Sequence, residues 1–259
     1  MNNSPIANYF DVPEEFIPYL AELFADFGEL GTDPGIICQW MKAICTESPI
    51  RKVLDLGCGK GAVSIPLAVE LGVDVYGVDA YRPFVESARI EAAKLNVAHR
   101  CCYELGNIYD VVKVATDYDL VMYLAVGNVL GSLSEIVAQI RQTVRDGGYM
   151  LIDDGFRTSE STIQFPHHEY YVPYEETIQQ LTSCGDKIVR EQVYSLPYTR
   201  AMNDRYNTWL HKRAAILRQQ HREFNHVLDQ LLERERQECK ILETQMAMAM
   251  WLLQKPKYE

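Results

Sequence analysis

The chain has 259 residues, of which 47% are hydrophobic, and 36 acidic residues outweigh 25 basic ones to give a formal net charge of −11. This length suits one large α/β domain, alone or with an appended cap. A nucleic-acid backbone would be repelled by the surplus of negative charge, so nucleic acid is not an expected partner. No run of about 18 uncharged apolar residues and no secretory leader pattern is present, so we expect a cytoplasmic protein without a membrane partner.

The cysteines give no sign of a metal or redox site. There are seven of them, and none forms a CxxC pair. The adjacent Cys101 and Cys102 are able to bind a soft metal, but cysteines in an apolar strand more often pack as small hydrophobic residues. We therefore expect no bound metal.

Residues 1–48 have helical patterns. The segment PEEFIPYLAELFADF begins with Pro13 and two glutamates, which suit a first helical turn, and its apolar residues recur at helical spacing. A second helix is expected from Asp33 to Cys45. Because these helices precede the first expected strand, we interpret 1–48 as an N-terminal helical lid and its first 30 residues as lid, not core.

From residue 51 short apolar runs alternate with helical patterns. The expected strands are KVLDLG, VDVYGVDA, HRCCYELGN, YDLVMYLA and YMLIDDG, most of them separated by a helix. Strands joined by crossover helices form parallel sheets with both faces covered. The sequence therefore predicts an α/β core over residues 49–155.

Residues 156–259 are less regular. A helix is expected at YEETIQQLTSCG, a strand at DKIVREQVYSL, one long helix over 203–240 and a final strand at ETQMAMAMWLLQKP. Apolar residues of the long helix recur every seven positions, but Ala214, His221 and Glu235 would be poor residues in a coiled-coil seam. We favour a single apolar stripe lying on the domain, which leaves monomer and homodimer both open.

The stretch VLDLGCGKGAVSIPLA, residues 53–68, places Gly57, Gly59 and Gly61 directly after a buried strand. A strand that ends in a glycine turn and opens a helix presents free backbone N–H groups at its carboxyl end, where an adenosine cofactor can bind. With Ala62 the same residues satisfy the dinucleotide pattern GxGxxA, so the glycines alone do not select the cofactor.

Two acidic residues narrow the choice of cofactor. Asp79 ends the second expected strand, where a carboxylate accepts the ribose hydroxyls, a feature that NAD enzymes share. Asp55 lies two residues before Gly57; it would repel a pyrophosphate and attract a sulfonium that also carries an amino group. The alternative for Asp55 is a structural one, in which it caps the following helix or bonds the glycine loop.

Residues 49–155 resemble the class I S-adenosylmethionine (SAM) dependent methyltransferases. DLGCGKG is similar to the first motif of that family, VYGVDA to the second, GNIYD to the adenine-contacting turn and YDLVMYLAVGNVLG to the fourth-strand motif. The resemblance implies a Rossmann-like, doubly wound sheet of about seven strands, mostly parallel with an antiparallel last strand. N-terminal helices and a long helix before the last strand complete the expected fold.

The resemblance also implies the cofactor, SAM, and its product, S-adenosylhomocysteine. The expected cofactor-binding residues are Asp55, Gly57, Cys58, Gly59, Gly61, Asp79, Ala80, Asn107, Ile108 and Leu124. The first-motif residues would hold the methionine portion, Asp79 the ribose, and Asn107 or Ile108 would border the adenine. The family usually has aspartate at the position of Asn107.

Methyl transfer from a sulfonium is an in-line displacement, so positioning matters more than acid or base chemistry. An ammonium or hydroxyl acceptor must lose a proton, and a base for this is sought after the fourth and fifth strands. The GN pair in GNVLGS is similar to small-molecule N-methyltransferases. The catalytic candidates are Asn128, Asp153, Asp154 and His167, with His168 beside them; turn formation, helix capping and a solvated loop are the structural alternatives.

These observations favour a SAM-dependent methyltransferase that acts on a small molecule through an N, O or S nucleophile, with 156–259 as a substrate cap. An RNA or protein methyltransferase is the second interpretation; the acidic balance and the lack of an NPPY-like motif after the fourth strand disfavour it. An NAD-dependent oxidoreductase or a non-catalytic nucleotide-binding module is the alternative of another class.

Overall fold

The computed structural model describes residues 5–28, 31–46 and 48–257. The chain divides into two compact units, one made of Met1–Gly28 and Tyr194–Met246, the other of Glu29–Val193 and Ala247–Glu259. We call them the helical unit and the sheet unit. Their boundaries do not follow the predicted division into lid, core and cap, and that functional division stays a prediction.

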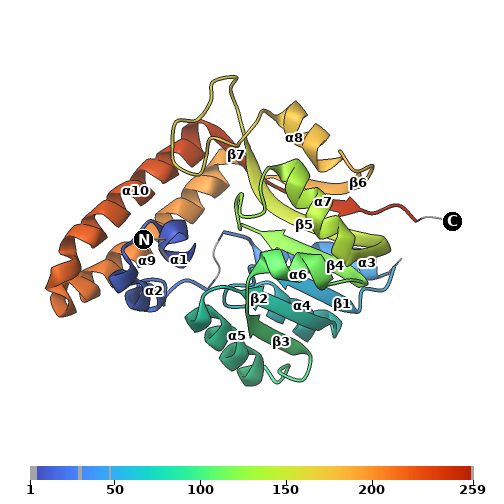
Figure 1. The fold of residues 1–259 in the computed structure, drawn as a ribbon, viewed down its shortest axis with the longest axis horizontal. Coiled ribbons are helices and arrows are strands. Elements are labelled where there is room, and N and C mark those ends of the chain that lie inside the picture. Colours follow the sequence, from blue (N-terminus) through green and yellow to red (C-terminus); the bar gives the residue numbers. More distant parts are fainter. Residues whose placement is uncertain (1–4, 29–30, 47, 258–259) are drawn as a thin grey trace. The chain divides into compact units, whose positions relative to one another are not determined.

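A seven-stranded sheet forms the sheet unit, in the order β3-β2-β1-β4-β5-β7-β6 (Figure 1). Neighbours among the first five strands pair in parallel, and β6 pairs with β7 in antiparallel orientation. The strands are β1 (Lys52–Leu56), β2 (Asp74–Asp79), β3 (Cys101–Leu105), β4 (Tyr118–Leu124), β5 (Val144–Arg157), β6 (Lys187–Val193) and β7 (Met246–Gln254). The predicted mixed sheet with an antiparallel last strand is confirmed.

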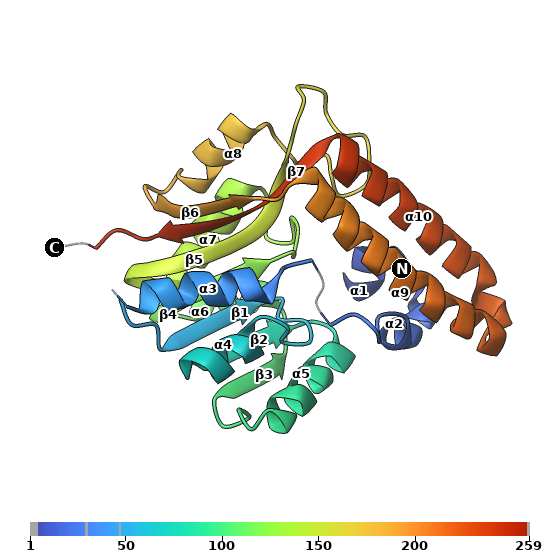
Figure 2. The ribbon, with the colours of Figure 1, turned by 180° about the vertical axis from the view of Figure 1, so that it is seen from behind.

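Helices cover both faces of this sheet, as Figures 1 and 2 show from opposite sides. One face carries α3 (Pro34–Cys45), α4 (Ser64–Leu71) and α5 (Arg82–Lys94), and the other carries α6 (Ile108–Val114), α7 (Leu133–Thr143) and α8 (Tyr174–Leu181). This doubly wound arrangement follows from the alternation of strand and helix along the chain, because each parallel crossover returns over one face.

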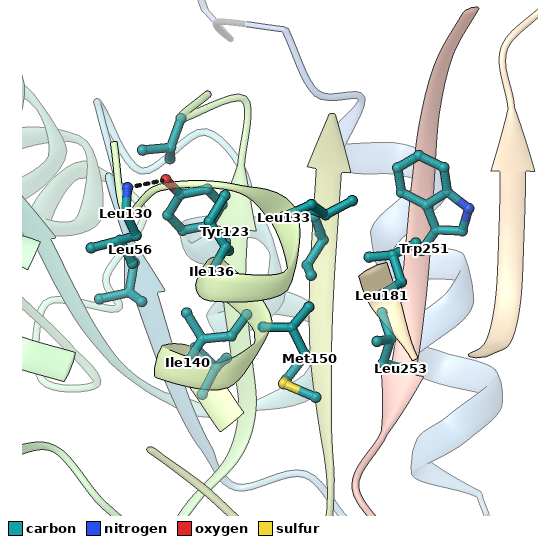
Figure 3. Packing of buried hydrophobic residues seen from close by; sticks show 14 of the residues in the cluster. Leu56, Tyr123, Leu130, Leu133, Ile136, Ile140, Met150, Leu181, Trp251 and Leu253 are labelled. Carbon is teal, nitrogen blue, oxygen red and sulfur yellow. Dashed lines mark hydrogen bonds between the residues drawn. The ribbon is translucent and has the colours of Figure 1, made fainter. Parts of the chain in front are cut away.

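Strand periodicity decides which residues reach the site. Alternate residues of the central strands, among them Leu56, Tyr123 and Met150, pack into a buried cluster against α7 (Figure 3). Burying one such apolar side chain stabilises the fold by about 1.5–3 kcal/mol. Since successive side chains of a strand point to opposite faces, Asp55 and Asp153 lie on the other face, the one that α3 and α4 cover.

The helical unit corrects the prediction of one continuous helix over 203–240. Two helices, α9 (Leu196–Gln220) and α10 (Asn225–Thr244), lie side by side and are joined by the short η2 (Arg222–Phe224). His221 leaves the helical conformation with φ −134° and ψ 69°. The apolar residues at seven-residue spacing are therefore divided between two helices and do not form one stripe.

The remaining elements of the helical unit are α1 (Pro5–Phe10), η1 (Glu14–Phe16) and α2 (Ile17–Leu23). Phe16 is 1% exposed, and its ring centroid lies 5.4 Å from that of Phe224. Asp26 forms ion pairs with Lys212 and Arg213 of α9. The described part of the first 30 residues therefore supplies buried side chains to the helical unit, and its interpretation as a lid stays a prediction.

Candidate functional site

The turn after β1 is held by backbone hydrogen bonds. The N–H groups of Gly57 and Cys58 donate to the carbonyl of Val78 over 2.9 and 3.0 Å. Gly57 has a φ of +75°, and a Cβ at this position would lie 2.7 Å from Cγ2 of Val126. Both the left-handed conformation and the close packing require glycine here.

Gly61 closes the same turn and opens the way into α4. Its φ is +74°, and a Cβ would meet Cδ1 of Ile65 at 2.7 Å and the hydroxyl of Tyr103 at 2.9 Å. The Tyr103 hydroxyl is also 2.9 Å from that of Ser64, the first residue of α4. At Gly57 and Gly61, the space that a side chain would need is taken by neighbouring protein groups, which the sequence did not reveal.

Asp79 ties the glycine turn to the end of β2. Its Oδ2 accepts the N–H of Gly59 over 2.9 Å and its Oδ1 accepts the N–H of Tyr81 over 2.8 Å. Burial raises the pKa of Asp79, and these two hydrogen bonds oppose the rise. Each carboxylate oxygen has a second acceptor position, so Asp79 is able to accept a ribose diol while it holds the turn.

Asp55 lies beneath this turn and is only 4% exposed. Burial raises its pKa to about 7, the Ser64 hydroxyl lowers it, and the charge of Asp79 adds to the rise. The contact with Ser64 at the start of α4 supports part of the structural alternative. Asp55 nevertheless lacks a cationic partner among the described residues, so a positively charged ligand group would stabilise its ionised form.

The expected adenine border lies after β3. Asn107 is exposed and caps α6, because its Oδ1 accepts the N–H of Tyr109 over 2.9 Å. Asparagine and aspartate cap helices about equally well, which explains why either residue serves at this position. Ile108 is buried, and Ala80 beyond β2 is exposed. The side chain of Asn107 is thus engaged by the helix that follows it.

Tyr123 holds the loop after β4 from below. Its hydroxyl donates to the carbonyl of Gly127 over 2.8 Å and accepts the N–H of Leu130 over 3.4 Å (Figure 3). Asn128 is exposed, and its carbonyl accepts the N–H of Gly131 over 2.9 Å. The turn alternative for Asn128 is therefore present in its backbone, while its side chain is left exposed.

Leu124 ends β4 half-buried, and the next residue connects this strand to β5. Ala125 has a φ of +54°, and its N–H donates to the carbonyl of Asp153 over 3.0 Å. A Cβ on Gly31, in the segment before α3, would lie 2.8 Å from that of Ala125. The chain before α3 thus passes closely over the ends of β4 and β5.

Asp153 is 5% exposed and incompletely satisfied. Its Oδ2 and Oγ1 of Thr32, which is 4% exposed, are both buried with no other hydrogen-bond partner among the described residues, and the Thr32 hydroxyl is the group placed to bond this carboxyl. Burial raises the pKa of Asp153 to about 7; the nearby Thr32 hydroxyl lowers it and Asp154 raises it further. The sequence analysis missed Thr32, whose one signal is its place directly before the helix start at Asp33.

Asp154 points to the other face of the sheet and is satisfied. Its Oδ1 accepts the hydroxyl of Tyr171 over 2.7 Å and the N–H of Gly155 over 3.0 Å. Burial raises its pKa to about 6 against these two bonds. The ring of Tyr171 lies 4.2 Å from that of Tyr170, whose hydroxyl is 3.6 Å from where a Cβ of Gly127 would be.

Of the two adjacent histidines, the structure buries His168 and leaves His167 exposed at a φ of +65°. The His168 ring lies 5.5 Å from that of Tyr171, and its Nδ1 is 3.1 Å from the carbonyl of Pro166. Among the contacts of the described residues none joins His167 to Asp153, so the catalytic role of His167 stays a prediction. In the described ranges no three His, Cys, Asp or Glu residues are grouped to hold a metal ion, and no helix is long and apolar enough to cross a membrane.

The charges at this edge of the sheet fit one cofactor chemistry better than another. Asp55 is the last but one residue of β1, Asp79 ends β2, and Asp153 and Asp154 lie in β5 where its pairing with β4 ends. None of the four forms an ion pair with a described residue. A dianionic pyrophosphate would be repelled here, whereas an ammonium and a sulfonium would be attracted. The donor set therefore fits SAM.

Comparisons with known proteins agree with this chemistry. A family model described as "Methyltransferase domain" matches residues 48–212. The chain is 32% identical over 101 residues to the ubiquinone biosynthesis O-methyltransferase of Mesorhizobium japonicum, and the match covers 39% of this chain and 39% of that protein. The matched part is thus about two fifths of the length of that curated relative.

Two solved structures have the same fold. The SAM-dependent methyltransferase of Thiobacillus denitrificans, in complex with S-adenosyl-L-homocysteine, has a TM-score of 0.73 at 18% identity, over 93% of this chain and 98% of that one. The SAM-dependent methyltransferase of Geobacter sulfurreducens, in the same complex, has a TM-score of 0.75 at 16% identity, over 91% and 97%. With a family model that matches more than half of its residues, the chain belongs to the class I SAM-dependent methyltransferase family.

Proposed function

We propose that the protein transfers a methyl group from SAM to a small-molecule acceptor by in-line displacement. The observation that carries the proposal is the hydrogen bond from the Gly59 N–H to the carboxylate of Asp79. The carboxyl of Asp55, which has no cationic partner among the described residues, lies beneath this turn. This arrangement offers an acceptor for a diol and negative charge within one edge of the sheet, while the N–H groups of Gly57, Cys58, Gly59 and Gly61 are bonded within the turn and to Val78 and Asp79.

The cofactor would lie over β1 and β2, in the crevice at the carboxyl ends of the strands. Asp79 would accept the ribose hydroxyls, Ile108 would border the adenine, and Asp55 would face the positively charged methionine portion. The other proposed cofactor-binding residues are Gly57, Cys58, Gly59, Gly61, Ala80, Asn107 and Leu124. When bound, the cofactor supplies an activated methyl group, and the protein orients the acceptor and excludes water.

The acceptor would then approach from above β4 and β5, where Asn128, Asp153 and Asp154 lie, with His167 as a further candidate. Asp153 is the strongest of these candidates, because the Thr32 hydroxyl is the one side-chain donor placed near its buried carboxyl. Asp154 is already engaged by Tyr171, which suits a positioning role for the segment that follows β5. Residues 156–259 remain the proposed substrate cap, and oligomeric state (monomer or homodimer) and cytoplasmic location remain predictions.

Equilibrium binding tests the cofactor class directly. A ligand that binds only the native state adds RT ln(1 + [L]/Kd), about 2.7 kcal/mol at a hundredfold excess over Kd. We expect S-adenosylhomocysteine to raise the melting temperature of the purified protein and NAD to leave it unchanged. Stabilisation by NAD alone would overturn the proposal in favour of the oxidoreductase alternative.

A further inference from the structure

Three residues in one row across the sheet connect β3 to the candidate cofactor site. In the register of the parallel strands, Asp55 of β1 pairs with Gly77 of β2, and Gly77 pairs with Tyr103 of β3. Because side chains alternate between the two faces along every strand, residues paired in this way share a face. The side chains of Asp55 and Tyr103 are both buried there, with only a glycine between them.

Gly77 leaves room for the tyrosine ring. A Cβ at Gly77 would lie 2.5 Å from Cδ1 of Tyr103, so the ring occupies the space that a side chain of β2 would fill. The Tyr103 hydroxyl reaches the start of α4, where it lies 2.9 Å from Oγ of Ser64. Arg89 of α5 donates two hydrogen bonds to the carbonyl of Tyr103, over 2.8 and 2.5 Å, and so fixes the backbone that carries the ring.

The single hydrogen of the Ser64 hydroxyl gives these contacts a direction. Ser64 is 0% exposed, and its hydroxyl also bonds the carboxyl of Asp55. An ionised carboxylate only accepts hydrogen bonds, and a serine hydroxyl has one hydrogen to donate. Ser64 therefore donates to Asp55 and accepts from Tyr103, so two hydroxyls form a chain from β3 to Asp55. A hydroxyl that accepts a hydrogen bond is itself a stronger donor.

We propose that Tyr103 is a positioning residue: acting through Ser64, it holds the Asp55 carboxylate ionised and oriented toward the amino group of bound SAM. This inference rests on the proposed function, in which Asp55 faces the positively charged methionine portion. Tyr103 is 2% exposed, and a Cβ at Gly61 would lie 2.9 Å from its hydroxyl. The hydroxyl is therefore enclosed by protein groups, and it acts through the serine and not by contact with the ligand.

The groups around Asp55 make its ionisation depend on this donor. Burial raises the pKa of Asp55 to about 7, the Ser64 hydroxyl lowers it, and the charge of Asp79 raises it. The other titratable groups near this chain stay neutral between pH 5 and 8, because burial raises their pKa values; they are Cys58, Cys101 and Tyr103. The hydrogen bond from Ser64 is therefore the contact from a described side chain that favours the charged form of Asp55.

The experiment compares two ligands that differ in the amino-acid portion alone. S-adenosylhomocysteine carries the amino group that Asp55 would receive, and 5′-methylthioadenosine has a methyl group in place of the whole amino-acid portion. In isothermal titration, we expect Ser64→Ala to weaken S-adenosylhomocysteine binding about tenfold and Tyr103→Phe about threefold, because a hydrogen bond to a charged group is lost or weakened. The affinity for 5′-methylthioadenosine should not change. The double variant should lose no more than Ser64→Ala alone, since Tyr103 acts through the serine.

The pH dependence of binding supplies a second readout. Because the amino group binds the ionised carboxylate, the affinity of the wild type for S-adenosylhomocysteine should rise as the pH rises through about 7 and level off above it. The midpoint should move to higher pH in Ser64→Ala and in Tyr103→Phe, because a bond that lowers the pKa of Asp55 is lost or weakened. Asp79 would serve the ribose that both ligands share, so the pH profile of 5′-methylthioadenosine measures its contribution.

Tyr76→Phe is the matched control, because it removes a hydroxyl of β2 that donates over 2.8 Å to the exposed Glu104. It should bind both ligands as the wild type does. Tyr103→Phe keeps the ring beside Gly77, so it should fold, and its melting temperature checks this.

Equal losses of affinity for the two ligands in Ser64→Ala and Tyr103→Phe would overturn the inference, because the residues would then serve the turn and not Asp55. Unchanged affinity for S-adenosylhomocysteine, additive losses in the double variant, or a pH midpoint in Tyr103→Phe equal to that of the wild type would overturn it as well. Failure of the wild-type protein to bind S-adenosylhomocysteine would instead contradict the proposed function.

Discussion

The hydroxyl of Tyr171 donates a 2.7 Å hydrogen bond to Oδ1 of Asp154, which holds the segment after β5 to a residue inside that strand. The only other hydrogen bond to Asp154 in the described ranges comes from the backbone N–H of Gly155. Asp154 is 5% exposed and Tyr171 is half-buried, so the bond replaces solvation that the buried carboxyl cannot recover locally.

Tyr171→Phe should therefore destabilise the protein. It leaves a buried carboxyl with one donor fewer, and we expect the free energy of unfolding to fall by about 1–3 kcal/mol in urea denaturation. The pKa of Asp154 should rise further, because a bond to its ionised form is lost. Tyr174→Phe is the control, since it removes a 3.1 Å bond to the exposed Glu191. If the free energy of unfolding falls equally in the two variants, the Tyr171–Asp154 bond stabilises the protein no more than an exposed hydrogen bond does.

Asp79→Ala should weaken cofactor binding by on the order of 2–4 kcal/mol, because it removes charged acceptors for a diol and for the N–H groups of Gly59 and Tyr81. Isothermal titration with S-adenosylhomocysteine measures this loss. Asp74→Asn, at the amino end of the same strand, should bind as wild type does. A folded Asp79→Ala variant with unchanged affinity would show that this carboxylate does not serve the cofactor.

Gly57→Ala should destabilise the fold without any ligand present. A positive φ costs a non-glycine residue about 1–2 kcal/mol, and the new methyl group would lie 2.7 Å from Cγ2 of Val126. Thermal denaturation of the apoprotein measures the total. Adding Val126→Ala should relieve the clash and leave the conformational part, so a partial recovery is expected; complete recovery would mean that the turn conformation costs nothing.

The buried acids should also make the free energy of unfolding depend on pH. The pKa values of Asp55 and Asp153 are raised to about 7 and that of Asp154 to about 6, chiefly by burial. The unfolded chain loses these protons near pH 4, so between pH 4 and 7 the folded state binds more protons. Stability from these groups is therefore lost as pH rises through this window and is constant above it.

Denaturation midpoints at pH 5 and pH 8 measure this loss in the apoprotein. Asp55→Asn and Asp153→Asn should each reduce the difference, because an amide does not ionise. Acids with lowered pKa values change the free energy of unfolding only below about pH 4, so they do not contribute to the difference between pH 5 and pH 8. Asp26, whose pKa is lowered to about 2 beside Arg213 and Lys212, is an example. Stability that rises from pH 5 to pH 8 in the wild type, with no effect of the two substitutions, would contradict the assigned protonation states.

Local sequence signals were sufficient for most of the fold. The alternation of strand and helix, the glycine turn and the acid at the end of β2 are features of short segments, and the sheet order then follows from right-handed crossovers. Asp55 and Asp79 are accordingly predicted as cofactor-binding residues from their places near the ends of the first two strands, from charge and from the family resemblance, and this role stays a prediction. Asn107 is predicted to border the adenine, and its role as the N-cap of α6 is a finding of the structure.

Features that depend on contacts between distant segments could not be predicted from the sequence. The break at His221 interrupts a seven-residue pattern of apolar residues that continues in the sequence, and beyond it α10 packs back on α9. Thr32 meets Asp153 across more than a hundred residues of chain, and no local pattern marks either as unsatisfied. The space at Gly57 is filled by Val126 from the loop after β4.

Measurements of stability and of turnover distinguish a structural role of the N-terminal helices from a role as a lid alone. Phe16 is 1% exposed, and its ring contacts those of Tyr19 and Phe224 within the helical unit. Replacing a buried phenylalanine by alanine costs about 3–5 kcal/mol, so Phe16→Ala should lower the melting temperature sharply even without cofactor or acceptor. Leu196→Ala, at a 42% exposed position that begins α9, is the control, and a surface change of this kind stays within about 0.5 kcal/mol.

A residue that served only a lid would show the reverse behaviour, with wild-type stability and lower turnover. If Phe16→Ala melts with the wild type, the N-terminal helices are not part of the core of the helical unit.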